Sequence, residues 1–349
     1  MTARAAKGVA FLAGGDVAIN RASGRGAFGR LAPLFRRAGA AFVNLELPLS
    51  RRGRPAAKEI LLRGAPDMAA ALSEARFDLL GIANNHILDY GEEALADTLD
   101  LLEEGGFAHT GAGANIAAAR RSALIERGGL RIGLLAYSSI IPRGFAAGPN
   151  KAGLNPLRAH TAYRQHRDLT EYPGTLPAVS TWAEPEDLRR MKREVRTLKK
   201  RADIVIVNHH WGTSMIPDPR DFQGEIAHAT VDAGADLVLG GHPHLLQGIE
   251  FHRGVPIVYS MGNLIFDFKI PFFTEASKQT FLFGATLTKS GAADTHFIPC
   301  WSGDFEKPRL LSPRGGKGKA IVDLMRRLSA PFGTRIETEG GRVLVNPGK

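Results

Sequence analysis

The sequence predicts an α/β fold in which helices cover buried β-sheets, and three observations support this prediction. Segments typical of strands alternate with segments typical of helices along most of the 349 residues. Strand segments such as DIVIV (203–207) and DLVLG (236–240) continue after their first Asp without polar alternation, as strands covered on both faces do. Polar side chains gather at the ends of the strand segments, where the ligand crevice of an open α/β sheet lies.

The N-terminal part of the chain predicts a regular succession of elements. Short apolar runs mark the strands, and apolar residues at helical spacing mark the helices. They are strand 8–14, helix 26–38, strand 40–46, helix 66–75, strand 77–83, helix 91–104, and strands 122–127 and 130–137. Asp89 is expected to cap the N-terminus of the helix 91–104, and Gly105 is expected to end it.

Residues 142–183 interrupt this succession. The segment is rich in Gly, Pro, Arg and His and has no clear period, so we expect a long loop of the kind that closes over ligands. The elements after it are helix 184–201, strand 203–210, helix 221–233, strands 236–242, 256–263, 280–287 and 295–301, helix 317–328 and strand 342–346. We expect residues 8–269 to form the main domain and residues 270–349 to complete or cap it.

The composition limits the class of function. Lys and Arg total 45 and Asp and Glu total 35, a net charge of +10 that favours anionic partners. We expect the basic helix faces to be solvated rather than to bind nucleic acid. Cys300 is the only cysteine, so neither an internal disulfide nor a thiolate metal cluster can form. Because a signal peptide and a long apolar span are both missing, we expect a cytoplasmic protein without a membrane anchor.

The polar residues at the strand ends are of the types that bind metal ions. They are Asp16, Asn44, Glu46, Asn84, Asn85, His86, His209, His210, His242, His244 and Asn263. Imidazole, carboxylate and amide groups suit Mn, Zn, Fe or Mg. The set is larger than one ion needs, which indicates two divalent metal ions about 3.5–4 Å apart that share a carboxylate.

Each of these residues taken alone also has a purely structural explanation. A single buried His is often a satisfied core residue, and Asp16 and Asn44 are residue types common in turns. His242-Pro243-His244 is more specific, because this spacing directs two imidazoles into one site beside the small Gly240 and Gly241. The coincidence of such residues at several strand ends is what indicates a metal centre.

Six motifs give the chain a resemblance to a known family. They are GD (15–16), NLELPL (44–49), ANNHILDYG (83–91), HWG (210–212), GGHPHLLQG (240–248) and SMGNLIFD (260–267). With these motifs the chain resembles the CapA (PgsA) proteins of capsule and poly-γ-glutamate synthesis, a branch of the calcineurin-like metallophosphoesterase superfamily. The resemblance covers residues 9–267 and implies a four-layer αββα sandwich with mixed sheets and a metal site across the sheet edge.

The resemblance also implies roles for individual residues. It implies a set of metal ligands consisting of Asp16, Glu46, Asn85, His210, His242 and His244. His86 would be the acid or base that faces the substrate, and Asp89 would either orient His86 or cap the following helix. His209 is the weaker candidate of its pair, because HWG begins at His210. Ser214 stands where the family usually has Glu, so substrate contacts or local charge are expected to differ there.

Three functions are compatible with this resemblance. The first is a metal-dependent hydrolase for an anionic phosphoester, or for a γ-glutamyl or peptide bond, with Arg21, Arg51, Arg52 and Asn263 as substrate contacts. The second is a peptide epimerase that uses the same metals. The third is a non-catalytic accessory subunit that binds a poly-γ-glutamate ligase and its acidic polymer.

Overall fold

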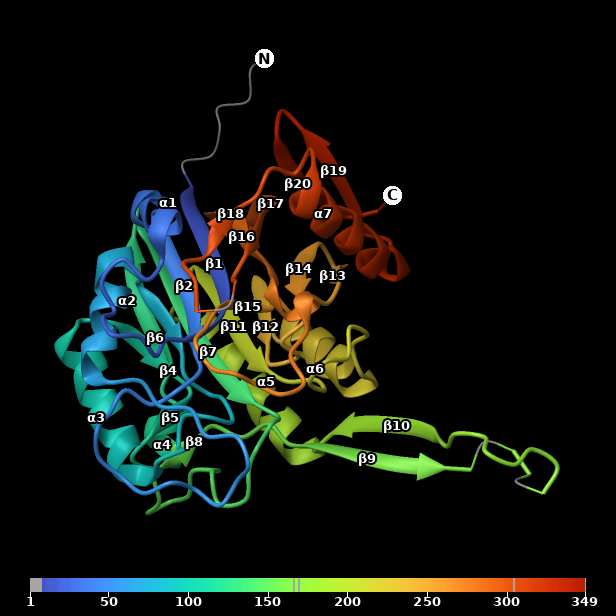
Figure 1. The fold of residues 1–349 in the computed structure, drawn as a ribbon, viewed down its shortest axis with the longest axis horizontal. Helices are drawn as coiled ribbons and strands as arrows, with labels where there is room; N and C mark the ends of the chain where they lie inside the picture. The colour runs from blue at the N-terminus through green and yellow to red at the C-terminus, as the bar shows by residue number, and fades with distance from the viewer. Residues whose placement is uncertain (1–7, 166, 169, 304, 349) are drawn as a thin grey trace.

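Two mixed β-sheets pack against each other, and helices cover their outer faces (Figure 1). The computed structural model describes residues 8–165, 167–168, 170–303 and 305–348. Within these residues the order of layers is helices, sheet, sheet, helices, which confirms the four-layer αββα sandwich. Helices α1, α2 and α3 lie along one side of the sandwich, and α5 and α6 lie along the other (Figure 1).

The first sheet has its strands in the order β19-β20-β17-β16-β1-β2-β3-β4, with β15 beside β1 and β18 beside β17. Its strands are β1 (Val9–Ala18), β2 (Ala40–Leu45), β3 (Leu79–Gly81), β4 (Ala108–Thr110), β15 (Asn263–Phe266), β16 (Gln279–Thr288), β17 (Gly291–Trp301), β18 (Arg309–Leu310), β19 (Arg335–Glu339) and β20 (Arg342–Asn346). Strands β1 to β4 run parallel, whereas β16 and the strands beyond it pair antiparallel. The sheet is therefore mixed, as predicted.

The second sheet has fewer strands, in the order β13-β14-β12-β11-β7-β6. Its strands are β6 (Ala123–Arg127), β7 (Leu130–Ser138), β11 (Ile204–His210), β12 (Leu237–Gly241), β13 (Ile249–His252) and β14 (Val255–Val258). Strands β7, β11, β12 and β14 are parallel neighbours, and β6 and β13 form antiparallel edges. The strands predicted at 122–127 and 130–137 are confirmed as β6 and β7, which pair antiparallel.

The alternation of side chains along one strand explains the layers. On β11, Ile204 and Ile206 face the core between the two sheets, whereas Val205 and Val207 face the helices. All four are fully buried, and each such side chain contributes about 1.5–3 kcal/mol to folding. A continuous apolar run is thus required here, because both faces of the strand are covered.

The helices match their predicted positions with local differences. They are α1 (Ala32–Arg37), α2 (Ala69–Ala75), α3 (Gly91–Glu104), α4 (Ile116–Ala119), α5 (Pro185–Lys199), α6 (Asp221–Asp232) and α7 (Gly316–Ser329), with 3₁₀ turns η1 (Gly29–Leu31), η2 (Pro66–Met68), η3 (Glu275–Lys278) and η4 (Ala330–Phe332). The predicted helix 26–38 is shorter because Pro33 fits only the first turn of an α-helix. The capping role of Asp89 is wrong: Tyr90 precedes α3, and no side chain caps it.

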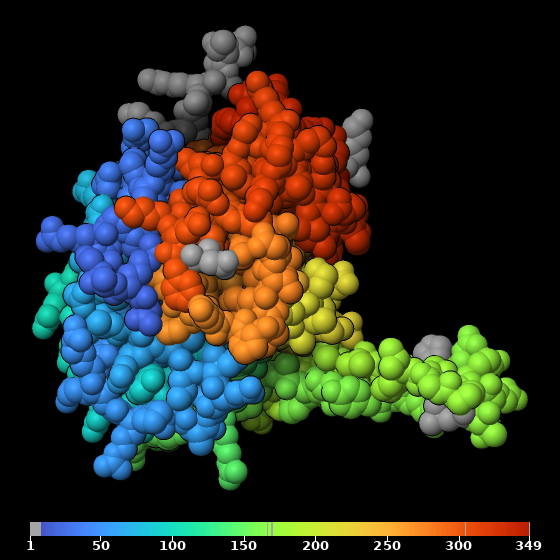
Figure 2. All heavy atoms as spheres, viewed as in Figure 1, coloured from blue at the N-terminus to red at the C-terminus, as the bar shows by residue number. Residues whose placement is uncertain are grey.

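The segment expected to be a loop, residues 142–183, contains strands. They are β8 (Gly153–Leu154), which pairs with β5 (Ala112–Gly113), and β9 (Ala159–Arg164), which pairs antiparallel with β10 (Ala178–Ala183). Strands β9 and β10, called the arm below, project away from the rest of the molecule (Figure 2), and only the base of the arm meets helix α6. Both faces of the arm are largely exposed, so its sequence lacks the polar–apolar alternation that marks a half-buried strand.

The predicted strand 256–263 is divided between the two sheets. Its first part is β14, and its last residue, Asn263, begins β15 in the other sheet. The chain turns between them at Gly262, which has a φ of +67° and no room for a Cβ beside the Gln279 carbonyl. This crossing places Asn263 next to β1, where it contributes to the site described below.

The C-terminal strands extend the first sheet from β16 outward, and α7 packs Ile321, Val322 and Met325 into the core between the sheets. The boundary between residues 269 and 270 stays a prediction. In the part of the chain that the structure describes, no helix combines the length and apolar composition needed to cross a membrane.

Candidate functional site

Parallel strands bring the predicted polar residues to one edge of the sandwich. Asp16 on β1 lies beside Asn44 on β2 on one side and beside Asn263 on the other. In the facing sheet, His210 at the end of β11 lies beside Gly241 at the end of β12. Because both sheets end here, residues from two separate strand layers line the same space.

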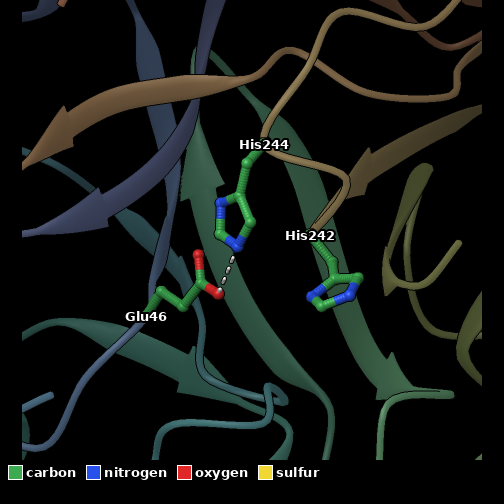
Figure 3. A group of neighbouring side chains, drawn as sticks. All are labelled: Glu46, His242 and His244. Carbon is green, nitrogen blue, oxygen red and sulfur yellow. Dashed lines mark ion pairs between the residues drawn. The ribbon is translucent and has the colours of Figure 1, made fainter. Parts of the chain in front are cut away.

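Glu46 lies at the centre of this space. It is fully buried, and neither carboxylate oxygen has a hydrogen-bond partner among the described residues. Its Oε1 lies 3.3 Å from Nε2 of His210 and 3.9 Å from Nε2 of His244. Figure 3 shows the carboxylate directed toward the ring of His244, with His242 beside it.

Two groups of potential metal ligands meet at Glu46. One consists of Asp16, Glu46 and His210, and the other of Glu46, His242 and His244. Within each group the ligand atoms lie within 4.8 Å of one another. This arrangement fits two cations that share one carboxylate. The structure thus brings the predicted ligands together, while the metal, its identity and the number of ions stay predictions.

The asparagines at the edge of the first sheet have separate tasks. Oδ1 of Asn85 lies 2.7 Å from Nε2 of His210, so Asn85 belongs to the first group. Nδ2 of Asn44 donates to Oδ1 of Asp16 at 2.8 Å and fixes that carboxylate. Nδ2 of Asn84 donates to the Leu45 carbonyl at 2.7 Å, away from the potential ligands.

The turn after β12 holds two histidines in unusual backbone conformations. His242 has a φ of +93° and His244 a φ of +56°, a region that costs a non-glycine residue ~1–3 kcal/mol. The His242 amide donates to Oδ2 of Asp16 at 2.9 Å, which ties this turn to the first sheet. A Cβ on Gly241 would lie 2.4 Å from Oδ1 of Asp16, so only glycine fits there.

Neighbouring side chains orient each imidazole of this turn. Ser214 lies 3.1 Å from Nε2 of His242, and Nδ1 of His242 is left without a partner among the described residues. Oδ1 of Asn263 lies 2.9 Å from Nδ1 of His244, which leaves Nε2 facing Glu46. Ser214, which departs from the family pattern, therefore contacts a predicted ligand.

Burial disfavours charge throughout the site. It raises the pKa of Asp16 to about 7, with the neighbouring Glu46 adding to the effect, and it raises the pKa of Glu46 well above its ordinary value. Burial lowers the pKa of His210 to about 4 and that of His244 to about 3. The histidines are thus neutral, which is the form that binds metal ions.

His86 belongs to a second cluster at the mouth of the site. Its Nδ1 lies 2.6 Å from Oδ2 of Asp89, so Asp89 orients His86 instead of capping α3. Nζ of Lys58 donates to Oδ1 of Asp89 at 2.6 Å and lies 3.1 Å from the same His86 nitrogen. Sequence reasoning missed Lys58, because it stands in an irregular segment without a motif or period.

A cavity of about 220 Å³ opens beside both clusters. Its lining comprises Lys58, Glu59, Ile60, Asn85, His86, Ser214, His242, His244, Phe266, Ile270, Phe272 and Phe273. A second cavity of about 400 Å³ shares Phe266, Ile270 and Phe273 with it and also contacts Lys269. No described residue of the segment 142–183 lines either cavity, so the segment does not cover the site in this structure.

The predicted arginine contacts lie outside this cavity. Arg21 forms an ion pair of 2.6 Å with Asp267, and Arg52 pairs with Asp97. Arg51 is exposed and lines a separate cavity. Their role in substrate binding stays a prediction.

His209, the weaker candidate of the pair His209-His210, also lies away from the candidate ligands. Its ring stacks between Tyr137 and Trp211 on the helix side of the second sheet. Its Nε2 lies 3.0 Å from Oγ1 of Thr230 on α6. His209 is therefore a satisfied core residue.

The curated relatives of the chain include proteins with names that refer to capsule and polymer synthesis. A protein of Bacillus subtilis (strain 168) named PGA biosynthesis protein CapA is 34% identical over 67% of this chain and 55% of its own length. A Mycobacterium tuberculosis protein named probable polyglutamine synthesis accessory protein is 29% identical over 86% of this chain and 75% of its own. The chain thus spans just over half the length of the Bacillus relative.

A solved structure, that of TT1561 of Thermus thermophilus, aligns with 79% of this chain and 93% of its own, with a TM-score of 0.39 and 12% identity. The family model described as bacterial capsule synthesis protein PGA_cap matches residues 7–268. Since this match covers about three quarters of the sequence, the chain belongs to the PGA_cap family of bacterial capsule synthesis proteins.

Proposed function

We propose that this chain is a dinuclear metal-dependent hydrolase that acts on an anionic substrate in capsule or poly-γ-glutamate synthesis. The bond that it cleaves would be a phosphoester or a γ-glutamyl or peptide bond. The observation that carries the proposal is Glu46, a fully buried carboxylate whose two oxygens lack hydrogen-bond partners among the described residues. The membership of the PGA_cap family supports the link to capsule synthesis.

The surroundings of Glu46 support cations as its missing partners. Leaving a buried carboxylate unpaired costs several kcal/mol or shifts its pKa, and here the pKa is raised. Nδ1 of His242 has no hydrogen-bond partner among the described residues, and the turn that carries His242 is strained; both add to the cost in free energy. Cations held by Asp16, Glu46, Asn85, His210, His242 and His244 would offset these costs together.

The chain's own residues then have distinct tasks. Divalent ions bound here would supply Lewis acidity and activate water for attack on a phosphorus or carbonyl centre. Nδ1–H of His86 is held by Asp89, so His86 would give a proton to the leaving group through Nε2 in its doubly protonated form, which the neighbouring Asp89 favours. Lys58 would attract the anionic substrate from the cavity wall, and Phe266, Ile270 and Phe273 would exclude bulk water.

Metal analysis tests the proposal first. Protein purified without chelator is expected to contain at least two equivalents of transition metal or Mg, and Glu46→Gln is expected to lose at least one. Glu92→Gln, at an exposed position in α3, is the matched control and should keep the wild-type content. Less than about half an equivalent in the wild type would contradict the proposal.

Activity assays test the reaction. Aryl phosphate mono- and diesters, γ-glutamyl peptides and ordinary peptides serve as substrates. The His86→Ala variant is expected to keep its metal and to lose about 10²–10⁴-fold in kcat, the usual contribution of a general acid. Deuterium incorporation at a peptide Cα without cleavage would instead identify an epimerase.

A second candidate role is that of an accessory subunit, and the arm favours it. Tyr163, Val179 and Trp182 are exposed on the arm, with 72%, 46% and 41% of their surface accessible. An isolated two-stranded hairpin with exposed apolar residues is typical of a segment that gains partners on binding. A Mycobacterium relative is named as an accessory protein of polyglutamine synthesis, which agrees with this role.

Binding to a poly-γ-glutamate ligase subunit tests the accessory role. Co-expressed wild-type protein is expected to purify with the ligase, and the double variant Tyr163→Asp/Val179→Asp is expected to lose it while keeping its metal. The exposed Leu124, away from the arm, provides the control variant Leu124→Asp. Equal retention of the ligase by all three proteins would exclude the arm as the contact.

A further inference from the structure

A second group of histidines and carboxylates lies on the outer side of the second sheet. His228 and Asp232 stand one helical turn apart on α6, and Glu250 and His252 stand two residues apart on β13. One ligand atom each from His228, Glu250 and His252 lies within 4.8 Å of the others. None of these residues contributes to the candidate metal centre around Glu46.

The two imidazoles of this group are held side by side. Their rings stack with centroids 4.2 Å apart and an interplanar angle of 10°. Nε2 of His228 lies 2.7 Å from Oε1 of Glu250, and Nε2 of His252 lies 3.0 Å from Oδ1 of Asp232. Each imidazole from one element therefore meets a carboxylate from the other element, which links α6 to β13 twice.

The carboxylates are themselves oriented by further side chains. Tyr259 directly follows β14. Its hydroxyl donates to Oε2 of Glu250 at 2.7 Å and leaves Oε1 for the imidazole of His228. Tyr259 is buried, and burial raises its pKa, so it remains a donor. On the other side, Nε of Arg253 lies 3.2 Å from Oδ1 of Asp232. Ligands with such supporting hydrogen bonds are typical of metal sites.

We propose that His228, Glu250 and His252 bind a divalent transition metal ion of the zinc class, with Asp232 orienting the His252 ring. Two imidazoles and one carboxylate suit Zn²⁺, which takes nitrogen and oxygen ligands at about 2.0–2.2 Å. The half-buried position leaves a side open to solvent, where water completes the coordination. The ion replaces the proton that now joins Nε2 of His228 to Glu250, while Nε2 of His252 keeps its contact with Asp232.

The proposed site lies between an edge strand and a helix, so a bound ion would cross-link these two elements. Strand β13 is an edge strand of the second sheet, paired on one side only by β14. Helix α6, which the ion would join to it, also carries Thr230, the partner of His209, and Gln223, which donates to Gln247 at 3.0 Å. A metal ion between α6 and β13 therefore fastens the edge of the sheet to the helix layer. This inference does not rest on the proposed hydrolase function.

Zinc stoichiometry of the tag-free, chelator-stripped protein tests the proposal. In equilibrium dialysis against Zn²⁺, the wild type is expected to bind one equivalent more than His228→Ala/His252→Ala. The control His109→Ala/His296→Ala also removes two half-buried histidines, but they lie outside every candidate ligand group of the described residues, so it should match the wild type. Equal binding by the wild type and the His228→Ala/His252→Ala variant would overturn the proposal.

A second variant guards against loss of the fold. Glu250→Gln keeps the shape of the side chain and an oxygen that can accept from Tyr259, yet it removes the charge that the ion requires. It is expected to lower the affinity of the same equivalent at least tenfold, with an unchanged melting temperature of the metal-free protein. Full retention of tight binding by Glu250→Gln would show that the ion lies elsewhere. The Glu46→Gln variant, measured in parallel, reports separately on the candidate centre.

Discussion

At the scale of single residues, the candidate site is built from side chains whose positions are fixed by burial and by the surrounding backbone. Glu46 is buried and belongs to both groups of potential ligands, and neither of its oxygens has a hydrogen-bond partner among the described residues. The backbone around it is equally constrained, because His242 and His244 adopt left-handed conformations and Gly241 adjoins Asp16. Small changes in this region are therefore expected to act on metal binding before they act on folding.

Gly241→Ala is expected to weaken metal binding at least tenfold. The added Cβ would lie 2.4 Å from Oδ1 of Asp16, so the carboxylate must leave its position. Isothermal titration with Mn²⁺ or Zn²⁺ measures the loss. Gly315→Ala is the matched control, because a Cβ there meets nothing within 4 Å. An affinity equal to that of the control would contradict the assigned role of Asp16.

Ser214→Ala is expected to lower metal affinity by about 10–100-fold, the usual effect of removing a group that orients a ligating imidazole. The hydroxyl lies 3.1 Å from Nε2 of His242 and leaves Nδ1 toward the site. Ser73→Ala removes an exposed hydroxyl as the control. If Ser214→Ala binds metal as the wild type does, then His242 is oriented by its backbone alone.

At the scale of elements, much of the fold could be predicted from the sequence. The strands β1, β2, β11 and β12 are recognisable by their apolar runs, which reflect burial of both faces of each strand. Helix α3 occupies the residues predicted for it. The alternation on β11 also separates its two histidines. Since Val205 and Val207 face the helices, His209 shares their side, and His210 faces the site.

Other elements could not be predicted, for physical reasons. The arm has two exposed faces and hence no alternation, and β14 and β15 form one apolar run that only the turn at Gly262 divides. Asp89 is a residue type that often caps helices, but its two carboxylate oxygens are bound by Lys58 and His86 instead. The sequence does not reveal these contacts, because Lys58 reaches the site through an irregular loop.

Shortening the arm is expected to leave the centre intact. Strand β10 is anchored near its base, where the Ala183 amide donates to Glu225 at 2.7 Å. Replacing residues 162–179 by a short Gly-Ser linker keeps this anchor and removes the outer part of the arm, whose described strand residues are largely exposed. Metal content and melting temperature should equal those of the wild type within experimental error. A loss of metal would show that the arm supports the site.

At the scale of the whole molecule, the candidate centre joins the two sheets. Asp16, Glu46 and Asn85 come from the first sheet or the loops after its strands, and His210, His242 and His244 come from the second. An ion bound at the proposed centre would therefore link the two layers of the sandwich. Binding to the native state alone stabilises a protein by about 2.7 kcal/mol at 100 times Kd.

Removal of metal by a chelator is expected to lower the melting temperature by several degrees. The fully buried site is lost on unfolding, so each ion bound there adds to the free energy of unfolding. Differential scanning calorimetry measures the shift, in the His228→Ala/His252→Ala background to exclude the surface site. In Glu46→Gln the chelator should have a smaller effect. An equal shift in Glu46→Gln would place the stabilising ion outside the centre.

The division of the centre between two sheets also has a consequence for how the chain matures during synthesis. Its last predicted ligand, His244, is added before β15 and β16, which both pair with β1 on the side opposite β2. A nascent chain that ends shortly after His244 thus has every ligand but lacks the strands that hold Asp16 in place. Tight metal binding at the proposed centre would therefore have to wait for the C-terminal strands, and it would mark the completion of the sandwich on the ribosome or after release.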